Sequence, residues 1–292
     1  MNVGRRAIGS VWRSGNWAAS WLIPAAWFGA PRSRVAVCLH IFHFDAAHQI
    51  IDRLEGISSR YSLFVTYPES LPHEVTSRLD KLNRDVSYIP VSNIGHDVYP
   101  FLVALRQAQA RDFDYICKIH TKRGDTDVAL TWREEMLAAV LGGDGQFKAM
   151  IKTLDRQRSV WLVGPEPIYK SAKTFMYANE SEVARLARLM EIPIDDDWGF
   201  FAGTMFWARR LLFEPLLEIP SEALPFAKAS SAGDGDLAHA MERMFGLLPR
   251  KVGGKVMVVR RSGEIVPAAR PSREAVTKTM RLLSQNRVVR RP

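Results

Sequence analysis

Cysteine is almost absent from this sequence. Among its 292 residues only Cys38 and Cys117 occur, too few for a disulfide framework or a cysteine-based zinc site. Both lie in apolar stretches, at residues 35–42 and 115–119. We therefore expect two buried, reduced thiols in a cytoplasmic protein.

The sequence also lacks a hydrophobic run long enough to span a bilayer. The uncharged segment 16–31 is shorter than the roughly 20 apolar residues that a spanning helix needs, and Pro24 interrupts it. Four tryptophans are interleaved with three arginines in the first 28 residues, a combination that favours the lipid headgroup zone. We predict an arm that lies on the membrane surface. A signal peptide cleaved near Gly29 and a helix packed on the body are the alternatives.

Acidic residues are scarce at both ends of the chain. Residues 1–34 contain five arginines and no acid, and residues 250–292 contain 12 Lys or Arg and two Glu. Residues 35–249 contain 23 basic and 29 acidic side chains, a net charge of −6. We predict a basic N-terminal arm (1–34), a globular domain (35–249) and a basic C-terminal extension (250–292). Basic ends favour anionic partners. Because the body shows no basic motif interleaved with aromatics and no recognition helix, we expect the inner-leaflet membrane surface as partner, and no nucleic acid. Nucleic-acid binding through the basic C-terminal extension is the alternative.

Residues 86–123 indicate the architecture of the domain. Two short runs of β-branched and aromatic residues flank a segment whose apolar residues recur at helical spacing. A strand, a crossover helix and a second strand predict a right-handed parallel unit. Ligands collect beyond the carboxyl ends of such strands. We therefore expect residues 93–97 and 120–123 to lie together on one rim.

The same alternation continues along the chain. It predicts an α/β fold with a Rossmann-type, mostly parallel sheet flanked by helices. Strands are expected at 35–42, 61–67, 86–91, 115–119, 160–163, 200–207 and 256–260, and helices at 46–56, 72–82, 101–108, 132–141, 146–154, 180–190, 209–217, 236–245 and 273–283.

Several short motifs occur in a fixed order along residues 35–248. They are His40-Ile41-Phe42-His43, Asn93-x-Gly95-x-Asp97-x-x-Pro100-Phe101, Lys118-Ile119-His120-Thr121-Lys122-Arg123, Trp132-Arg133, Leu162-Val163-Gly164-Pro165, Phe201-Ala202-Gly203-Thr204-Met205-Phe206-Trp207 and Asp234-Gly235-Asp236-Leu237-Ala238-His239-Ala240-Met241-Glu242-Arg243. By this series the sequence resembles the rhamnan synthesis protein F family, enzymes implicated in building rhamnose-rich cell-surface polysaccharides.

The resemblance implies a glycosyltransferase with a GT-A-like domain. Its nucleotide-binding half would be 35–123 and its acceptor half 124–249. The expected reaction moves rhamnose or another deoxyhexose from a nucleotide-sugar donor to a lipid-linked or polysaccharide acceptor. Such a protein would act in lipopolysaccharide or O-antigen synthesis, on the cytoplasmic side of the inner membrane. The alternative is a non-catalytic partner in a polysaccharide assembly complex that keeps the fold.

One departure from the GT-A pattern concerns the metal ion. In GT-A transferases an Asn-x-Gly loop opens the helix before the fourth strand, and that strand ends in an Asp-x-Asp that holds a divalent cation against the donor diphosphate. Asn93 and Gly95 fit the loop, but the Asp-x-Asp position reads His120-Thr121-Lys122. Lysine and arginine bring positive charge themselves. We therefore expect no metal cofactor, with His120, Lys122 and Arg123 binding the diphosphate. A solvated loop is the alternative.

A general base must take the proton of the acceptor hydroxyl. Asp236 is the first candidate and Asp234 the second, because they precede a helix on which Asp236, His239 and Arg243 share one face. Aspartates at a helix start also act as caps. Asp236 and His239 could instead bind a metal ion.

The other donor-side candidates lie at strand ends. His40, His43 and Thr66 follow or end the first two expected strands, where the nucleotide base or ribose would bind. Asp97 is expected to bind a ribose or sugar hydroxyl, although it could simply cap its helix.

Thr204, Trp198 and His239 are expected on the acceptor side. An indole there could stack on a sugar ring, although aromatic residues in strands more often pack in the core.

Overall fold

The computed structural model describes residues 35–82, 84–109, 111–123, 127–194, 197–227 and 235–269. The predicted N-terminal arm, Asp234 and the helix predicted at 273–283 lie outside these residues. Among the helices of the described segments, none combines the length and the apolar character of a bilayer-crossing segment.

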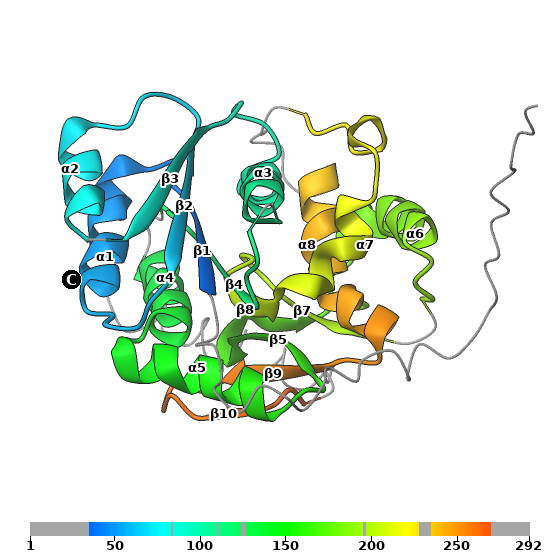
Figure 1. Cartoon of the computed structure of the whole chain (residues 1–292). Helices are drawn as coiled ribbons and strands as arrows, with labels where there is room; N and C mark the ends of the chain where they lie inside the picture. Colours follow the sequence, from blue (N-terminus) through cyan, green and yellow to red (C-terminus); the bar gives the residue numbers. More distant parts are fainter. Residues whose placement is uncertain are drawn as a thin grey trace, which may run out of the picture. The chain divides into compact units, whose positions relative to one another are not determined.

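The described residues build an α/β fold, as the sequence predicts (Figure 1). The main sheet has the order β10-β9-β5-β8-β4-β1-β2-β3, and β6 and β7 form a separate pair. The strands are β1 (Val35–His40), β2 (Ser62–Tyr67), β3 (Asp85–Pro90), β4 (Tyr115–His120), β5 (Val160–Pro165), β6 (Tyr169–Ser171), β7 (Gly199–Phe201), β8 (Phe206–Arg209), β9 (Lys255–Val259) and β10 (Ile265–Pro267).

Helices connect the strands. They are α1 (Phe44–Glu55), α2 (His73–Lys81), α3 (Val98–Gln109), α4 (Asp127–Val140), α5 (Asp144–Arg156), α6 (Glu180–Leu189), α7 (Glu214–Leu217) and α8 (Leu237–Leu247).

Most neighbouring strands are parallel, so the carboxyl ends of β1, β2, β3 and β4 share one rim. β1 pairs in parallel with both β2 and β4, and β2 with β3. β8 is the exception in the middle of the sheet, because it runs antiparallel to β4 and β5. In β1 and β4 every residue is buried, as expected of strands covered on both faces.

Two helical layers cover the sheet (Figure 1), and adjacent residues of β8 show which helices face which side. The Trp207 indole donates to the carbonyl of Val140 in α4 (2.9 Å), and its ring lies 4.7 Å from that of Phe147 in α5. The Phe206 ring lies 6.0 Å from Phe101 of α3 and 5.5 Å from Phe245 of α8. Because side chains alternate along a strand, α3 and α8 share the face opposite α4 and α5.

The stretch predicted as one strand at 200–207 is two strands in two sheets. β7 pairs with β6, whereas β8 joins the main sheet. Between them Gly203 (φ 88°) and Thr204 (φ 50°) adopt left-handed conformations, which turn the chain away from an extended path. Similarly, the helix predicted at 209–217 is a 3-10 turn, Arg210–Phe213, followed by the short α7.

The domain boundary predicted after residue 249 is wrong. β9 lies parallel beside β5, and β10 pairs antiparallel with β9. Residues 255–267 are therefore part of the main sheet.

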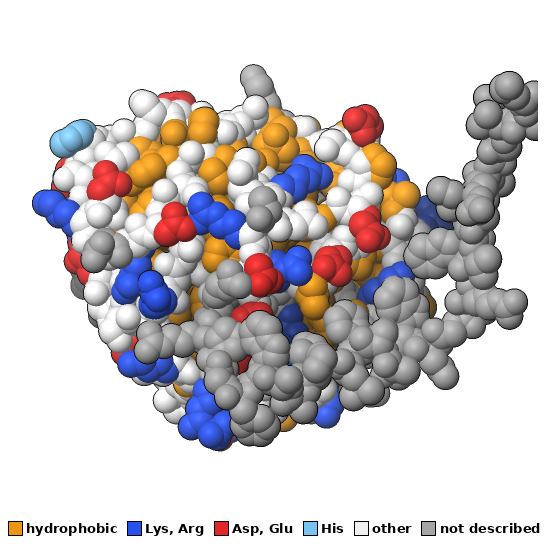
Figure 2. Space-filling view, in the orientation of Figure 1, with side chains coloured by type: hydrophobic (Ala, Val, Ile, Leu, Met, Phe, Trp, Pro, Cys, Tyr) orange, Lys and Arg blue, Asp and Glu red, His pale blue; other side chains and the backbone are white. Residues whose placement is uncertain are grey.

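On the face shown in Figure 2, acidic and basic side chains of the described body are interspersed rather than gathered by sign.

Candidate functional site

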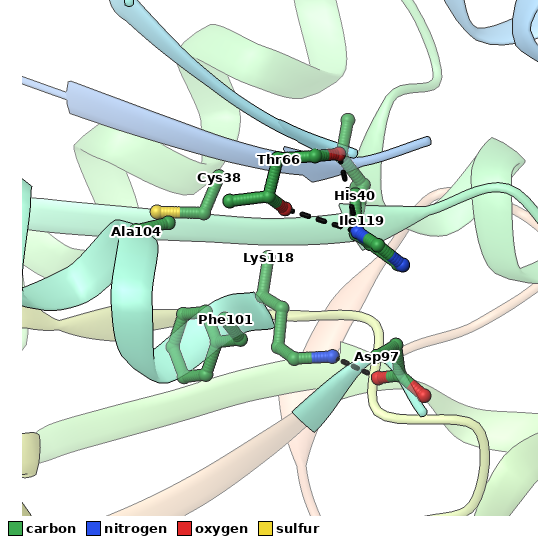
Figure 3. A pocket seen from close by; sticks show the side chains of 8 residues that line it. All are labelled: Cys38, His40, Thr66, Asp97, Phe101, Ala104, Lys118 and Ile119. Carbon is green, nitrogen blue, oxygen red and sulfur yellow. Dashed lines mark hydrogen bonds and ion pairs between the residues drawn. The ribbon is translucent and has the colours of Figure 1, made fainter. Parts of the chain in front are cut away.

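A buried lysine forms the centre of the polar cluster at the rim. Lys118, in β4, has a side chain that is 1% exposed. Its Nζ forms an ion pair with Asp97 and donates a hydrogen bond to Thr204 Oγ1 at 2.6 Å. The Thr204 hydroxyl in turn contacts the Asp97 carboxylate. Figure 3 shows the lysine extending from its strand, past Phe101 of α3, toward Asp97.

The three side chains come from separate segments. Asp97 precedes α3, Lys118 lies in β4, and Thr204 lies in the turn between β7 and β8. Burial opposes ionisation of Asp97, but the positive charge of Lys118 and the hydrogen bonds from Lys118 and Thr204 hold its pKa well below the usual range. Burial also lowers the pKa of Lys118, and Asp97 opposes that shift. A buried charge needs a partner of opposite charge, and Lys118 and Asp97 provide this for each other.

His120 lies at the end of β4 beside this pair. Its Nδ1 is 3.5 Å from Asp97 Oδ2 and makes no hydrogen bond to any described residue. Burial lowers the pKa of His120 to about 3, so its ring is neutral at pH 7. A neutral imidazole can hydrogen-bond a ligand there but cannot add positive charge.

His40 and Thr66 interact with each other at the ends of β1 and β2. His40 Nδ1 lies 3.1 Å from both the carbonyl oxygen and the hydroxyl of Thr66. Burial lowers the pKa of His40 to about 4. Together with Asp97 and Lys118, these two residues line a small pocket (Figure 3). Of the residues predicted for the donor side, His40, Thr66 and Asp97 therefore lie around one pocket.

The cationic residues after β4 diverge. Lys122 lies beside the β7–β8 turn, with its Nζ 3.6 Å from the position that a Cβ on Gly203 would take. Arg123 points elsewhere, because its guanidinium pairs with Asp45 at the start of α1 (3.2 Å) and both side chains are largely exposed. Thr121 is structural: its hydroxyl accepts hydrogen bonds from the backbone N–H groups of Phe42 and His43, both at 2.9 Å.

The loop before α3 is fixed by a close approach at Gly95. Its φ is 62°, and an added Cβ would lie 2.5 Å from the ring of Phe226. The Gly95 N–H donates to the carbonyl of Ala227 at 2.9 Å. Asn93 is exposed in the same loop. Glycine is needed here because a side chain has neither the space nor the backbone preference.

A second polar cluster lies at the start of α8. Asp236 caps this helix, since its Oδ1 accepts from the backbone N–H of His239 at 2.9 Å. The same oxygen lies 2.9 Å from His239 Nδ1, and Oδ2 lies 3.2 Å from Nε2 of His96 in the loop before α3. Burial opposes ionisation of Asp236, but the contacts with His239 and His96 keep its pKa below the usual value.

Glu242 of α8 links the two clusters. Its Oε1 accepts from the N–H of Gly203 at 2.6 Å, next to Thr204, and its Oε2 accepts from Arg243 at 2.8 Å. Burial raises the pKa of Glu242, and the charge of Asp97 adds to the effect. Helix α8 is thus joined to the turn that touches Lys118.

Trp198 does not line the site, contrary to the expectation for the acceptor side. It is 6% exposed, and its indole donates to the carbonyl of Arg243 at 3.0 Å. A buried ring has no face available for a sugar. Thr204, expected on the acceptor side, instead belongs with Asp97 and Lys118. His239 lies with Asp236, as predicted.

The two clusters differ in their suitability for a metal ion. A hard divalent ion prefers several oxygen ligands, but the end of β4 offers His120 and Lys122, and Asp97 is already paired with Lys118. That position does not fit such an ion. His96, Asp236 and His239 each offer one donor atom, and these atoms lie within 4.8 Å of one another. Two imidazoles and a carboxylate fit a transition metal ion.

Sequence reasoning missed Lys118, His96 and Glu242 as site residues. A usable signal existed for Lys118, because a lysine within a strand buried on both faces must have a counter-charge. His96 gave no such signal, since its only distinction is a position inside a turn. Glu242 lies on the same helix as Asp236 and His239 but was passed over.

The fold and the site define an α/β protein whose polar centre lies beyond the carboxyl ends of a mostly parallel sheet. Residues 23–253 match the model of the family described as rhamnan synthesis protein F. The chain therefore belongs to the rhamnan synthesis protein F family, and the resemblance seen in the motifs is confirmed.

The curated relatives of the chain share less than a third of its residues in the aligned region. The uncharacterized protein WxcX of Xanthomonas campestris pv. campestris (strain B100) is 28% identical over 243 residues, which are 82% of this chain and 35% of that protein. The chain thus spans about a third of the length of the curated relatives it matches.

Three solved structures show a distant likeness. S. aureus TarS 1–349 has a TM-score of 0.43 and 12% identity, over 86% of this chain and 64% of that one. Core-mannan synthase A from Aspergillus fumigatus in its Mn/GDP form has a TM-score of 0.38 and 10% identity, over 78% and 73%. Glucosyl-3-phosphoglycerate synthase from Mycobacterium tuberculosis, in complex with Mn²⁺, UDP-glucose and glycerol 3-phosphate, has a TM-score of 0.34 and 15% identity, over 86% and 76%.

Proposed function

We propose that the chain is a glycosyltransferase that moves a sugar from a nucleotide-sugar donor to a growing cell-surface polysaccharide. Family membership supports the reaction class. One structural observation carries the proposal for this chain: polar side chains from four separate segments converge beyond the carboxyl ends of the parallel strands. The segments are the loop before α3, the end of β4, the β7–β8 turn and the start of α8.

The proposed donor site uses fixed positive charge at the end of β4, without a divalent ion at that position. The leaving diphosphate gains negative charge during transfer, and a preorganised cation stabilises it. Lys122 is the cation suited to this role, because it is partly exposed and lies beside Gly203. Lys118 is fully engaged by Asp97 and Thr204 and holds the site together. Arg123 contributes only if it leaves Asp45.

The test of the donor site is turnover of nucleotide sugars by the purified full chain. Lys122→Ala removes the charge and is expected to lower kcat/KM for the donor about 10- to 100-fold, the loss of about 1.5–3 kcal/mol from a charged hydrogen bond. The matched control is Lys152→Ala, an exposed lysine of α5, which should leave kcat/KM unchanged. Equal turnover in the two variants would remove Lys122 from the donor site.

The proposed sugar is rhamnose or another deoxyhexose, and the proposed acceptor is a lipid-linked glycan. The family name supports the sugar. A thermal-shift screen with nucleotide-activated rhamnose, glucose, mannose and N-acetylglucosamine would rank the donors. The largest stabilisation is expected for the rhamnose donor. A larger shift with a different sugar would assign that sugar instead.

The second candidate function is a non-catalytic partner in polysaccharide assembly. The observation that favours it is the Lys118–Asp97 pair, because the acid before α3 is neutralised within the protein. Donor binding without turnover, in the presence of a lipid-linked acceptor, would select this candidate over the transferase.

The proposed location is the inner face of the membrane. Support comes from the five arginines and four tryptophans of residues 1–34 and the basic C-terminal residues, at about 1 kcal/mol for each basic residue at an anionic surface. The full chain should co-sediment with phosphatidylserine vesicles but not with phosphatidylcholine vesicles, and salt should release it. Equal sedimentation with both lipids would contradict the proposal.

A further inference from the structure

We propose that His96, Asp236 and His239 form a binding site for a transition metal ion of the zinc class. This site is separate from the end of β4, because its three donor atoms come from the loop before α3 and from the start of α8. The inference goes beyond the proposed transferase, since metal binding is a property of the chain whether or not a sugar is transferred.

The distances fit one ion. With metal–ligand bonds of about 2.0–2.2 Å, ligand atoms around a tetrahedral ion lie about 3.3 Å apart. Asp236 Oδ2 lies 3.2 Å from His96 Nε2, and Asp236 Oδ1 lies 2.9 Å from His239 Nδ1. The donor atoms of all three residues lie within 4.8 Å of one another. One donor atom from each side chain can therefore lie close to a single ion.

The donor types select the class of metal. Imidazole nitrogen suits zinc and other first-row transition ions, whereas calcium and magnesium prefer sites made of oxygen alone. Three protein ligands also leave a fourth position for an outside ligand. The side chains of His96, Asp236 and His239 are 33%, 29% and 31% exposed, so an ion and such a ligand can reach them.

The backbone holds the two imidazoles in place. His96 has a φ of 52°, a conformation that a non-glycine residue adopts at a cost. Gly95, before it, is tied to Ala227 by a hydrogen bond of 2.9 Å. Asp236 caps α8 and so fixes the first turn, where His239 lies. The two histidine rings end 5.2 Å apart between centroids.

An ion at this place would act on anions. Its open position and the amino end of α8 both favour an oxygen anion such as a phosphate. Under the proposed function, that phosphate belongs to the nucleotide-sugar donor. Asp236, expected from the sequence to be a general base, is thereby assigned as a metal ligand.

The experiment measures metal binding directly, on the full chain without any nucleotide sugar. Zinc is removed with a chelator, Zn²⁺ is titrated against a competing indicator, and Co²⁺ is added in parallel to record its visible absorption. We expect one Zn²⁺ per chain and a cobalt spectrum of nitrogen and oxygen ligands. Mg²⁺ is expected to leave the indicator signal unchanged.

Three variants keep the fold while removing one ligand each. Asn tolerates the left-handed conformation of residue 96, so His96→Asn is used there. Asp236→Asn keeps a good helix cap, and His239→Gln keeps a helix former in α8. Each variant should bind zinc at least about 100-fold more weakly, since even residues behind the ligands can cost 10–100-fold.

The matched control is His48→Asn. His48 lies on α1, where its ring faces Glu74 at 3.8 Å, and the variant should bind zinc like the parent chain. Circular dichroism confirms that every variant is folded. If the three ligand variants bind zinc as tightly as the control, the metal site is wrong. The transferase proposal is not affected by that result. Tight zinc binding without donor turnover would support the site and count against the transferase.

Discussion

Lys118 shows what a single buried charge demands of its surroundings. The side chain is 1% exposed and lies among apolar residues of β4 and α3. An unpaired ammonium in such a place would lose its proton or unfold the strand. Asp97 and Thr204 supply the missing interactions, so the cluster is as important for stability as for ligand binding.

Replacing Lys118 with methionine should therefore destabilise the protein strongly. Removing one partner of a buried ion pair leaves the other uncompensated, at a cost of about 3–5 kcal/mol. The free energy of unfolding in urea would measure the loss. The control is Lys148→Met, because Lys148 pairs with Asp144 on the surface with a side chain 61% exposed, and exposed pairs contribute about 1 kcal/mol at most. Similar losses in the two variants would contradict the structural role of Lys118.

Gly95→Ala is expected to cost more than the same substitution at Gly143. The φ of 62° adds strain, and the new methyl would lie 2.5 Å from the Phe226 ring. Overpacking of this kind costs about 1–3 kcal/mol. At Gly143 the φ is 96° but no atom would lie within 4 Å of an added methyl, so Gly143→Ala reports strain alone. The difference between the two unfolding free energies isolates the collisions with Phe226 and Tyr99. Equal unfolding free energies for the two variants would mean that the loop around Gly95 rearranges to accept the methyl group without loss of stability.

Sequence patterns identified some of these residues and missed others for physical reasons. Asp97 and His120 could be brought together because both follow strands that end on the same rim. His96 could not, because its partner lies 140 residues away in sequence and depends on how α8 docks beside α3. Trp198 was placed on the wrong side, because an aromatic residue near a strand looks the same whether its ring is buried or exposed.

Some secondary-structure elements were also predicted correctly from the sequence, and others were not. The buried strands β1 and β4 were predicted closely, since continuous apolar runs of that length leave few alternatives. The run at 200–207 was equally apolar, yet Gly203 and Thr204 divide it between two sheets. The strand β9 was predicted, but it was assigned to a basic extension outside the domain. Its pairing with β5 places it in the main sheet instead.

Helix α8 offers a way to separate capping from chemistry. Asp236→Ala removes the hydrogen bond to the His239 N–H, which should cost about 1 kcal/mol, whereas Asp236→Asn keeps an acceptor at that position. Both variants lose the carboxylate, so both should lose metal binding and any turnover. Thermal unfolding measures the first effect and zinc titration the second. Equal midpoints for Ala and Asn would show that the cap contributes nothing.

The whole molecule should also become less stable toward mildly acidic pH. Two histidines of the rim are buried in their neutral form, with pKa values of about 4 for His40 and about 3 for His120. In the unfolded chain each has a pKa of about 6.5. Above that value neither state binds a proton, so the stability is fully present. As the pH falls below it, the unfolded chain takes up protons that the folded chain refuses, and stability is lost until the pH reaches the folded pKa.

The size of this effect follows from the same linkage. Between pH 7.5 and pH 5 each buried imidazole should lower the free energy of unfolding by about 2 kcal/mol. The pair Asp97–Lys118 does not contribute in this window, because the depressed pKa of Asp97 matters only below the normal carboxylate range. Urea unfolding at both pH values gives the measurement. His40→Gln should remove about half of the loss, while His48→Gln, at a partly exposed position on α1, should leave it unchanged. A loss in His40→Gln equal to that of the parent chain would mean that the folded protein protonates His40 as readily as the unfolded chain does.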